Sequence, residues 1–463
     1  MNRIFTIVII AILSLGVNAQ NNGGITQDML NNFKASYNKN AKVEALQNAV
    51  SNNSISKLAL NRSNQSNLDT YFSDEVKTKG ITDQQSSGRC WLFTGLNVLR
   101  TKAIEKKNLG AFTLSQNYTF FFDQLEKSNL FLEAIIENID KPMNDKKVEW
   151  LFKHPINDGG QWTGVADLVN KYGVVPSDVM TETYSSNNTR WMSKLLGVKL
   201  KKDALALREM HKNGKKIKKI REAKENMLSD IYKILAINLG NPPTEFTWRY
   251  KDTDGNLSEA KTYTPQSFYK EFIGINLDDY VMFMNDPTRP YNKLYEIEYD
   301  RHSYTGNNWK YINLDTETIK PFAVASIKGN DAMYFSCDVG KQLDRDRGVL
   351  DVNNYNYNDV LDVDFDMNKV DRIKTFTSGS SHGMTLVAVD VDKDNNITKW
   401  LLQNSWGPSS GFNGNLIMTD KWFDEYMFRV VINKKYISED ILKILEQKPV
   451  FLPAWDPMFS TDK

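Results

Sequence analysis

The most restrictive feature of the sequence is a helix with almost no polar face, which begins at one of only two cysteines. A Ser-Ser-Gly turn at residues 86–88 leads into Cys90. The following turns carry a dense run of large apolar side chains: Trp91, Leu92, Phe93, Leu96, Val98 and Leu99. Such a helix must be covered on all sides, so it indicates a large globular domain. With 41% hydrophobic residues the chain can form that core, and the composition excludes disordered, collagen-like and coiled-coil classes.

The N-terminus has the features of a signal peptide. Arg3 precedes an apolar run from Ile4 to Val17, and Val17 and Ala19 are small residues suited to a cleavage site. A membrane-spanning helix needs about 20 apolar residues, so an uncleaved anchor is the weaker alternative. We therefore expect a signal peptide over residues 1–19 and an exported protein, periplasmic or secreted, with no stable membrane insertion after cleavage.

The two cysteines have different surroundings. Cys90 opens a helix, where free N–H groups and the helix dipole stabilise a thiolate, although a buried structural cysteine is the alternative. Cys337 lies in strand-like sequence without such a turn, and we expect it to be a buried apolar residue.

Metal chemistry is not expected. The four histidines, His154, His211, His302 and His382, do not pair at metal-ligand spacing, and the sequence has neither His-Glu-x-x-His nor Cys-x-x-Cys. The sequence therefore predicts neither a metal nor any other cofactor.

His382 lies between small residues, Ser381 and Gly383, at the start of a strand-like run. The turn signal at 392–396 predicts a hairpin, and if this is centred on Lys393, His382 and Asn404 are cross-strand partners. Asn404 would then accept a hydrogen bond from Nδ1–H, leaving Nε2 to face a thiol. A slip of one residue would turn the side chain to the other face, so the pairing depends on the register.

The second half of the chain is predicted to be rich in strands. Strand-like runs occur at Phe322–Ile327, Tyr334–Phe335, Met384–Val389, Trp400–Leu402 and Arg429–Ile432. Together with the helical first half, they predict an α+β protein with two packed lobes and a cleft between them.

Positive charge is concentrated in one segment of a chain that is otherwise balanced, with a net charge of +1. Between Lys199 and Lys224 lie eleven basic and three acidic residues, in a stretch from Leu196 to Tyr232 that is predicted to be a polar helix. The segment is either a polyanion site or, more simply, a solvated helical face, since aromatic residues do not alternate with the charges.

Three motifs in order resemble those of the papain-like cysteine peptidases: Gln84 ahead of Cys90-Trp91, then Ser381-His382-Gly383, then the segment 403–407 with Asn404 and Trp406. The resemblance implies that Cys90 is the nucleophile, His382 the general base and acid, and Asn404 the residue that orients it. It further implies that Gln84 donates to the oxyanion beside the Cys90 N–H, and that Trp406 shields the His–Asn pair. An activated thiol, a proton shuttle and oxyanion donors are what attack on an amide requires.

The likeness is closest to the bleomycin hydrolase and aminopeptidase C branch. Ser-Gly-Arg-Cys-Trp at 87–91 and the segments 157–162, 171–176, 337–341 and 452–458 are similar to that branch. Papain-type enzymes place the histidine about 130–150 residues after the cysteine, and the separation is about twice that here, so large helical insertions are implied.

The resemblance also implies activity and partners. It implies an aminopeptidase acting on peptide substrates, in which a C-terminal arm occupies part of the cleft and the carboxylate of Lys463 meets the substrate's α-amine. Gly159 and Gly160 would contact the substrate through their backbone. A homo-hexamer is implied as well, and its basic pore would be a possible nucleic-acid site.

The expected organisation is a signal peptide at 1–19, an N-terminal arm at 20–75 and a papain-like peptidase domain at 76–463. This domain would contain a basic helical insertion around 190–280 and the C-terminal arm around 440–463. Two other functions stay open: a secreted papain-type endopeptidase with an inhibitory N-terminal segment, and a polyanion-binding protein that uses the basic insertion.

Overall fold

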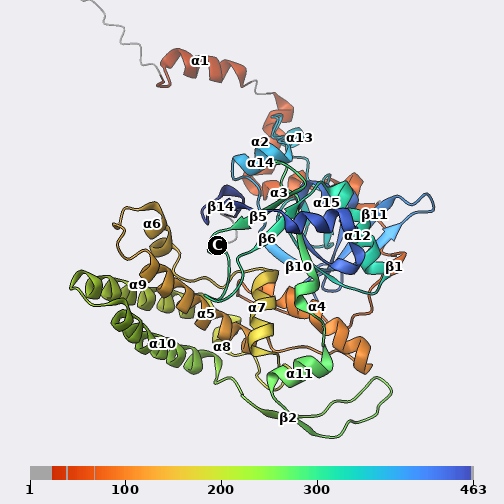
Figure 1. Ribbon diagram of the computed structural model, residues 1–463. Coiled ribbons are helices and arrows are strands. Elements are labelled where there is room, and N and C mark those ends of the chain that lie inside the picture. The colour runs from red at the N-terminus through yellow and green to blue at the C-terminus, as the bar shows by residue number, and fades with distance from the viewer. Residues whose placement is uncertain (1–22, 38–39, 67, 460–463) are drawn as a thin grey trace, which may run out of the picture. The chain divides into compact units, whose positions relative to one another are not determined.

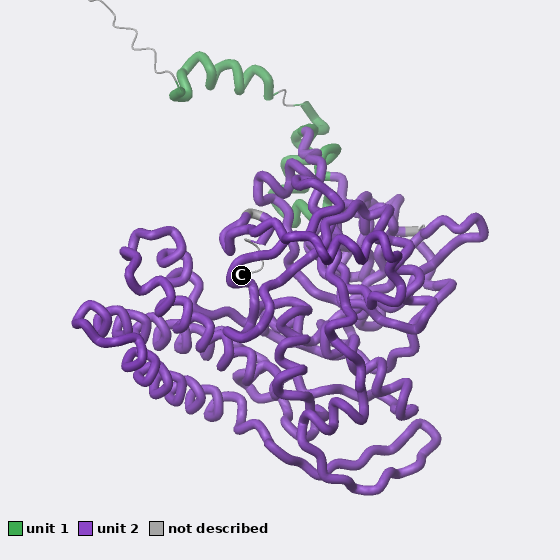
Figure 2. Tube along the Cα trace, viewed as in Figure 1, with its two compact units in different colours: residues 1–59, 357–363 green, residues 60–356, 364–463 purple. Residues whose placement is uncertain are grey.

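The computed structural model describes residues 23–37, 40–66 and 68–459. The chain divides into two compact units, one of residues 1–59 and 357–363 and a much larger one of residues 60–356 and 364–463 (Figure 2). The predicted signal peptide and Lys463 lie outside the described residues.

The smaller unit consists of short helices. Its described elements are α1 (Gln27–Ser36), α2 (Ala41–Asn52), α3 (Ile55–Ala59) and α13 (Tyr357–Leu361). Asparagine and threonine side chains cap the first two: Thr26 accepts from Met29 N–H, and Asn40 accepts from two N–H groups of the first turn of α2. None of the predicted site residues within the described part of the chain lies in this unit.

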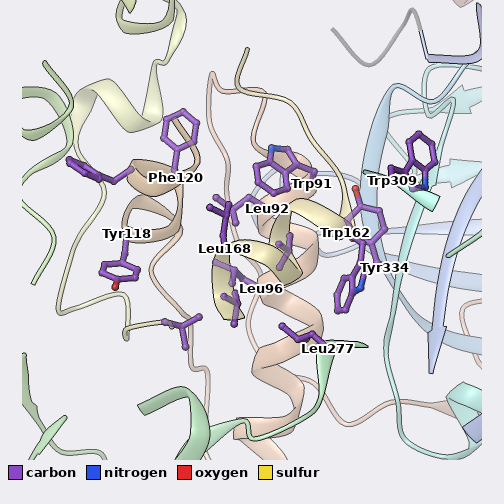
Figure 3. Packing of buried hydrophobic residues seen from close by; sticks show 14 of the residues in the cluster. Trp91, Leu92, Leu96, Tyr118, Phe120, Trp162, Leu168, Leu277, Trp309 and Tyr334 are labelled. Atoms are coloured by element: carbon purple, nitrogen blue, oxygen red, sulfur yellow. The ribbon is translucent and has the colours of Figure 1, made fainter. Parts of the chain in front are cut away.

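Helices fill the first half of the larger unit (Figure 1). They are α4 (Cys90–Lys107), α5 (Gln116–Glu137), α6 (Lys146–Lys153), α7 (Trp162–Tyr172), α8 (Tyr184–Asn187), α9 (Arg190–Lys212), α10 (Ile217–Leu239) and α11 (Pro265–Phe272). Helix α4 is buried along most of its length, as its sequence predicts. Figure 3 shows Trp91, Leu92 and Leu96 of this helix within one hydrophobic cluster, together with Trp162 and Leu168 of α7.

The basic stretch forms two helices instead of one. Helices α9 and α10 pack side by side (Figure 1), and they are separated by a turn in which Gly214 has φ +75°. Glycine readily adopts a positive φ, so Gly214 allows the chain to turn after α9. The single helix predicted over 196–232 is therefore interrupted at this turn. A small two-stranded sheet follows, formed by β2 (Phe246–Trp248) and β3 (Lys261–Tyr263).

A twelve-stranded sheet occupies the second half of the larger unit. Its strands are β1 (Asp74–Glu75), β4 (Tyr280–Met284), β5 (Lys293–Ile297), β6 (Lys310–Asn313), β7 (Met333–Cys337), β8 (Leu343–Asp344), β9 (Val349–Leu350), β10 (His382–Val391), β11 (Ile397–Gln403), β12 (Asn415–Thr419), β13 (Met427–Asn433) and β14 (Val450–Leu452). The order is β14-β5-β6-β4-β13-β7-β10-β11-β12-β9-β8, with β1 paired to β10. The remaining helices are α12 (Thr316–Lys328), α14 (Lys369–Lys374), α15 (Asp420–Tyr426) and α16 (Glu439–Leu442).

Four of the five predicted strands are present, as parts of β7, β10, β11 and β13. The fifth, Phe322–Ile327, is wrong, because these residues belong to helix α12. The side chain of Asp315 caps this helix at Thr318 N–H, and the buried residues recur at helical spacing: Ile319, Ala323, Ser326 and Ile327. The run from Phe322 to Ile327 is too short to show the helical period, and the capping residue Asp315 lies outside it, so the run alone resembled a strand.

The predicted hairpin is present, but its predicted register is wrong by two residues. Asp392 N–H donates to Asn396 O across the turn, which centres the hairpin on Asp394 instead of Lys393. Thr385 consequently pairs with Gln403 and Leu386 with Leu402, and β11 ends before Asn404. A slip of two residues keeps the side chains of Thr385 and Leu386 on their predicted face, because the side-chain period of a strand is two. Between Leu386 and Ala388 the register shifts by one further residue.

Candidate active site

The turn before Cys90 is held by the side chain of Asp158. Gly88 N–H donates to Asp158 Oδ2 at 2.7 Å, and Trp91 Nε1 donates to Asp158 O at 2.8 Å. A Cβ atom at position 88 would lie 2.4 Å from Asp158 Oδ1, so the position requires glycine. These contacts fix the start of α4, where Cys90 is half-buried as the first residue of the helix.

Strand β10 approaches the first turns of α4 closely. His382 is the first residue of β10, and it pairs with Cys337 on β7. At the next position, a Cβ atom on Gly383 would lie 3.5 Å from Trp91 Cα and 3.2 Å from Thr94 Oγ1. The strand that carries His382 thus packs closely beside the helix that begins with Cys90.

His382 and Asn404 are hydrogen-bonded, but through the ring nitrogen opposite to the predicted one. His382 Nε2 lies 2.8 Å from Asn404 Oδ1, which also accepts from Ser405 N–H at 2.8 Å. Since an amide oxygen only accepts, Nε2 carries the hydrogen and Nδ1 is the ring nitrogen left to act as a base. The prediction also placed Asn404 directly opposite His382, whereas Asn404 follows the end of β11.

Trp406 covers the imidazole. Its ring stacks on that of His382 with centroids 4.8 Å apart and an interplanar angle of 30°, and the guanidinium of Arg345 lies 4.6 Å from the Trp406 ring centroid. Burial lowers the pKa of His382 to about 4; the hydrogen bond that His382 donates to Asn404 opposes this shift and the positive charge of Arg345 adds to it. The imidazole is therefore neutral at neutral pH, as a general base must be.

Gln84 is buried and held against the segment that contains Asn404. Gln84 N–H donates to Ser405 O at 2.9 Å, and Ser405 Oγ donates to Gln84 Oε1 at 2.7 Å. One Nε2 hydrogen goes to Ser87 O at 2.7 Å. The amide is thus oriented with its nitrogen toward the turn that leads into Cys90, and its second hydrogen is available for another acceptor.

The Gly159-Gly160 segment packs against Trp91. Lys127 Nζ donates to Gly159 O at 2.6 Å. A Cβ atom at position 160 would lie 2.2 Å from His302 Cε1 and 2.8 Å from Trp91 Cδ2, so packing alone requires glycine there. Both glycines line a pocket that is bounded by apolar residues of α5 and α6 and by the largely polar segment 297–302. Their contact with substrate remains a prediction.

The C-terminal arm is anchored beside this pocket. Strand β14 pairs in parallel with β5, and Asp456 forms an ion pair with Arg289. Phe459 is buried against Trp309, with ring centroids 5.0 Å apart, and both Phe459 and Ala454 line the pocket. The last described residue of the chain is therefore held at the pocket that contains Gly159 and Gly160.

Comparison with known protein families matches residues 24–459 to the Peptidase C1-like family. The chain belongs to this family. The names of similar proteins confirm the predicted resemblance to the bleomycin hydrolase and aminopeptidase C branch. The chain is 38% identical to aminopeptidase C of Lactobacillus delbrueckii subsp. lactis, with 94% of this chain and 98% of that protein covered. It is 37% identical to bleomycin hydrolase of Mus musculus, with 95% and 99% covered.

A solved structure confirms the predicted fold class. The crystal structure of PepW from Lactobacillus rhamnosis matches this Peptidase C1-like chain with a TM-score of 0.91 and 40% identity, over 94% of this chain and 99% of that one. The fold is therefore α+β and papain-like, with the helices and the twelve-stranded sheet described above.

Two contacts of the site were not predicted from the sequence. Asp158 lies within the segment 157–162, but nothing in the sequence pairs it with Gly88. His302 Nδ1 lies 2.6 Å from Asp123 Oδ1, and the ring packs edge-on against Trp91 at 4.6 Å. Asp123 and His302 are 179 residues apart, and no local pattern connects them.

The basic stretch makes many of its contacts within the protein. Arg221 and Lys224 both pair with Glu133 of α5, and Lys199 pairs with Asp203 and Asp230. Arg208 donates to the carbonyls of Asn138 and Lys141. Lys199 thus ties α9 to α10, while Arg208, Arg221 and Lys224 fasten the two helices to the rest of the unit. The polyanion-binding alternative is not favoured.

Over residues 23–37, 40–66 and 68–459, the structure has no group of three or more acidic, histidine or cysteine side chains arranged to hold a metal ion. Within the same residues, no helix is both long enough and apolar enough to cross a bilayer.

Proposed function

We propose that the protein is a cysteine aminopeptidase that removes N-terminal residues from peptides through an acyl-enzyme intermediate. The observation that carries the proposal is the hydrogen bond from His382 Nε2 to Asn404, beside the start of the helix that opens with Cys90. The names of the relatives, aminopeptidases C, G and E and bleomycin hydrolase, agree with the predicted cysteine-type exopeptidase and do not favour an endopeptidase.

In the first step of the proposed reaction, Nδ1 of neutral His382 takes the proton of the Cys90 thiol as Sγ attacks the carbonyl carbon of the first peptide bond. The negative charge moves to the carbonyl oxygen, where Gln84 Nε2 and the Cys90 N–H donate to it. The C–N bond then breaks, and the Nδ1 proton passes to the leaving amine.

The second step regenerates the enzyme. Water attacks the thioester carbon while His382 Nδ1 accepts its proton, and Sγ leaves as the N-terminal amino acid is released. Throughout both steps the bond from Nε2 to Asn404 keeps the ring in place, and Trp406 keeps water away from that bond.

The restriction to N-termini is proposed to come from the C-terminal arm. Phe459 is anchored at the pocket beside Gly159 and Gly160, and residues 460–463 follow it in the sequence. A fixed carboxylate in the cleft would attract the substrate's protonated α-amine and would block a longer chain.

The test is mass spectrometry of the products from one peptide with a free N-terminus and from the same peptide acetylated, using wild type and Cys90→Ala. We expect stepwise trimming of the free peptide alone, and its loss in Cys90→Ala with the fold retained by circular dichroism. Internal cleavage of both peptides would overturn the aminopeptidase, and turnover by purified Cys90→Ala would overturn the nucleophile.

Export and assembly are further parts of the proposal. The apolar run at 4–17 supports cleavage after Ala19 and a periplasmic or secreted protein, which N-terminal sequencing of the protein recovered from each cell fraction would test. A homo-hexamer is supported by the resemblance alone, and sedimentation that shows only monomer at working concentration would refute it.

A further inference from the structure

An exposed arginine lies over the ring of Trp406, which itself covers His382. Arg345 lies in the loop between β8 and β9, and its guanidinium is 4.6 Å from the ring centroid of Trp406. Trp406 in turn stacks on His382 at 4.8 Å. A cation over an indole face is held there by the ring quadrupole, so the positive charge of Arg345 is kept at the edge of the site.

Arg345 and Arg347 of the same loop differ in their partners. Arg347, two residues further along the same loop, lies 3.7 Å from Asp344 Oδ2. By contrast, no carboxylate of the described residues lies within ion-pair distance of Arg345, whose side chain is exposed. The loop thus directs one arginine to the protein and the other to the solvent in front of Trp406.

The position of Trp406 indicates which portion of the substrate lies near Arg345. In the proposed reaction His382 must protonate the leaving amine, so the leaving portion departs past His382 and the Trp406 ring that covers it. Gly160 lies instead beside Trp91, and the arm lines the same pocket as Gly159 and Gly160, where the N-terminal portion would bind. Arg345 therefore lies on the side of the residues that follow the scissile bond.

We propose that Arg345 binds a carboxylate on the leaving portion of the substrate, an inference that rests on the proposed aminopeptidase function. Two sources supply such a group close to the scissile bond: the C-terminal carboxylate of a dipeptide, and the side chain of an aspartate or glutamate that follows the N-terminal residue. A guanidinium matches either group through paired N–H donors. The protein would thus favour very short peptides or peptides with an acidic second residue.

The experiment compares two matched pairs of peptides that share one N-terminal residue X. X-Asp-amide against X-Asn-amide tests the side-chain carboxylate, and X-Ala against X-Ala-amide tests the terminal one. The readout is the ratio of kcat/KM within each pair at low ionic strength, for wild type, Arg345→Gln, Arg345→Glu and the control Arg347→Gln. Both peptides of a pair meet the same His382, so any change in its protonation cancels in the ratio.

For wild type we expect a preference of about fivefold for the carboxylate in at least one pair, the upper range for a solvent-exposed ion pair. Arg345→Gln should bring that ratio to about one, Arg345→Glu should invert it, and Arg347→Gln should keep it. The pair that responds identifies the source of the carboxylate. Equal rates within both pairs for wild type, or a preference that survives Arg345→Gln, would overturn the inference.

A binding measurement separates this inference from the proposed function. Calorimetry of the same pairs on Cys90→Ala, with and without Arg345→Gln, should give the same ratio in Kd. A carboxylate preference in binding without any hydrolysis by wild type would support the Arg345 site and overturn the aminopeptidase. Hydrolysis without a carboxylate preference would support the aminopeptidase and overturn the Arg345 site.

Discussion

At the residue scale, the chemistry of the site depends on which ring nitrogen of His382 carries the hydrogen. Asn404 Oδ1 lies 2.8 Å from Nε2, and this contact orients Nδ1 for proton transfer. Asn404 is itself buried and accepts a second hydrogen bond, from Ser405 N–H, so its oxygen is fixed before substrate binds. The orientation of the base is therefore built into the folded protein.

We expect Asn404→Ala to lower kcat by about 100-fold, because the imidazole loses the group that holds its tautomer and ring orientation. Steady-state kinetics on a free-N-terminus peptide would measure the loss. Asn396→Ala is a matched control, since Asn396 bonds only to Asp392 in an exposed turn, and its kcat should stay near wild type. A kcat for Asn404→Ala equal to that of the control would contradict the orienting role.

The low pKa of His382 predicts a loss of stability in acid. Burial lowers that pKa to about 4 in the folded protein, against about 6.5 when unfolded. Between these values the unfolded chain binds a proton that the folded protein does not, so the free energy of unfolding falls as the pH falls from about 6.5 to 4. The expected contribution is about 3 kcal/mol.

Urea unfolding of Cys90→Ala at several pH values would measure this dependence without self-digestion. The variant Cys90→Ala/His382→Ala lacks the titrating group, so its stability should decline less over the same window. Parallel curves for the two variants would show that His382 is not buried as a neutral ring.

At the scale of elements, the segment 157–161 and helix α4 hold each other in place. Asp158 fixes the turn before Cys90, while Trp91 and His302 fill the space above Gly160. Because the interior at this point is closely packed, added atoms must displace a ring.

We expect Gly160→Ala to lower the free energy of unfolding by about 1–3 kcal/mol, since its Cβ would lie 2.2 Å from His302 Cε1. Gly110→Ala is the matched control, because a Cβ there meets no atom within 4 Å, and its effect should stay within about 0.5 kcal/mol. Equilibrium denaturation of both variants would measure the difference. Equal stabilities would mean that His302 moves aside freely.

Elements were predicted well from the sequence where their pattern is local. The buried helix from Cys90 and the strands of the hairpin follow from runs of apolar residues and a strong turn signal. The error at Phe322–Ile327 arose because the run is short, and only the cap at Asp315 and the period over the whole helix distinguish it from a strand. The register of the hairpin was wrong by two residues because the conformation of the turn decides where pairing begins, and the turn residues alone do not show it.

At the scale of the whole molecule, the proposed specificity depends on a segment far from the catalytic motifs in sequence. The arm reaches the pocket because β14 pairs with β5 and because Asp456 binds Arg289. Removing only the residues after Phe459 leaves these anchors intact.

We expect deletion of residues 460–463 to allow cleavage of the acetylated peptide, because the segment that is proposed to block the cleft is removed. Product analysis by mass spectrometry would detect the new internal fragments, and thermal unfolding should stay close to wild type, since Phe459 and its contact with Trp309 are kept. A variant that still trims only free N-termini would show that the arm does not impose the restriction.

The sequence by itself determined the family, the α+β class and the order of the motifs around Cys90, His382 and Asn404, because each motif is a short stretch whose chemistry depends on its neighbours. The tertiary structure decided which nitrogen of His382 bonds Asn404, why Gly160 must lack a side chain, and that Arg345 lies over Trp406. Each of these depends on side chains that are distant in the chain and meet only when helices and sheet pack. Local patterns carry no information about such distances, and a slip of one or two residues is enough to change the contact.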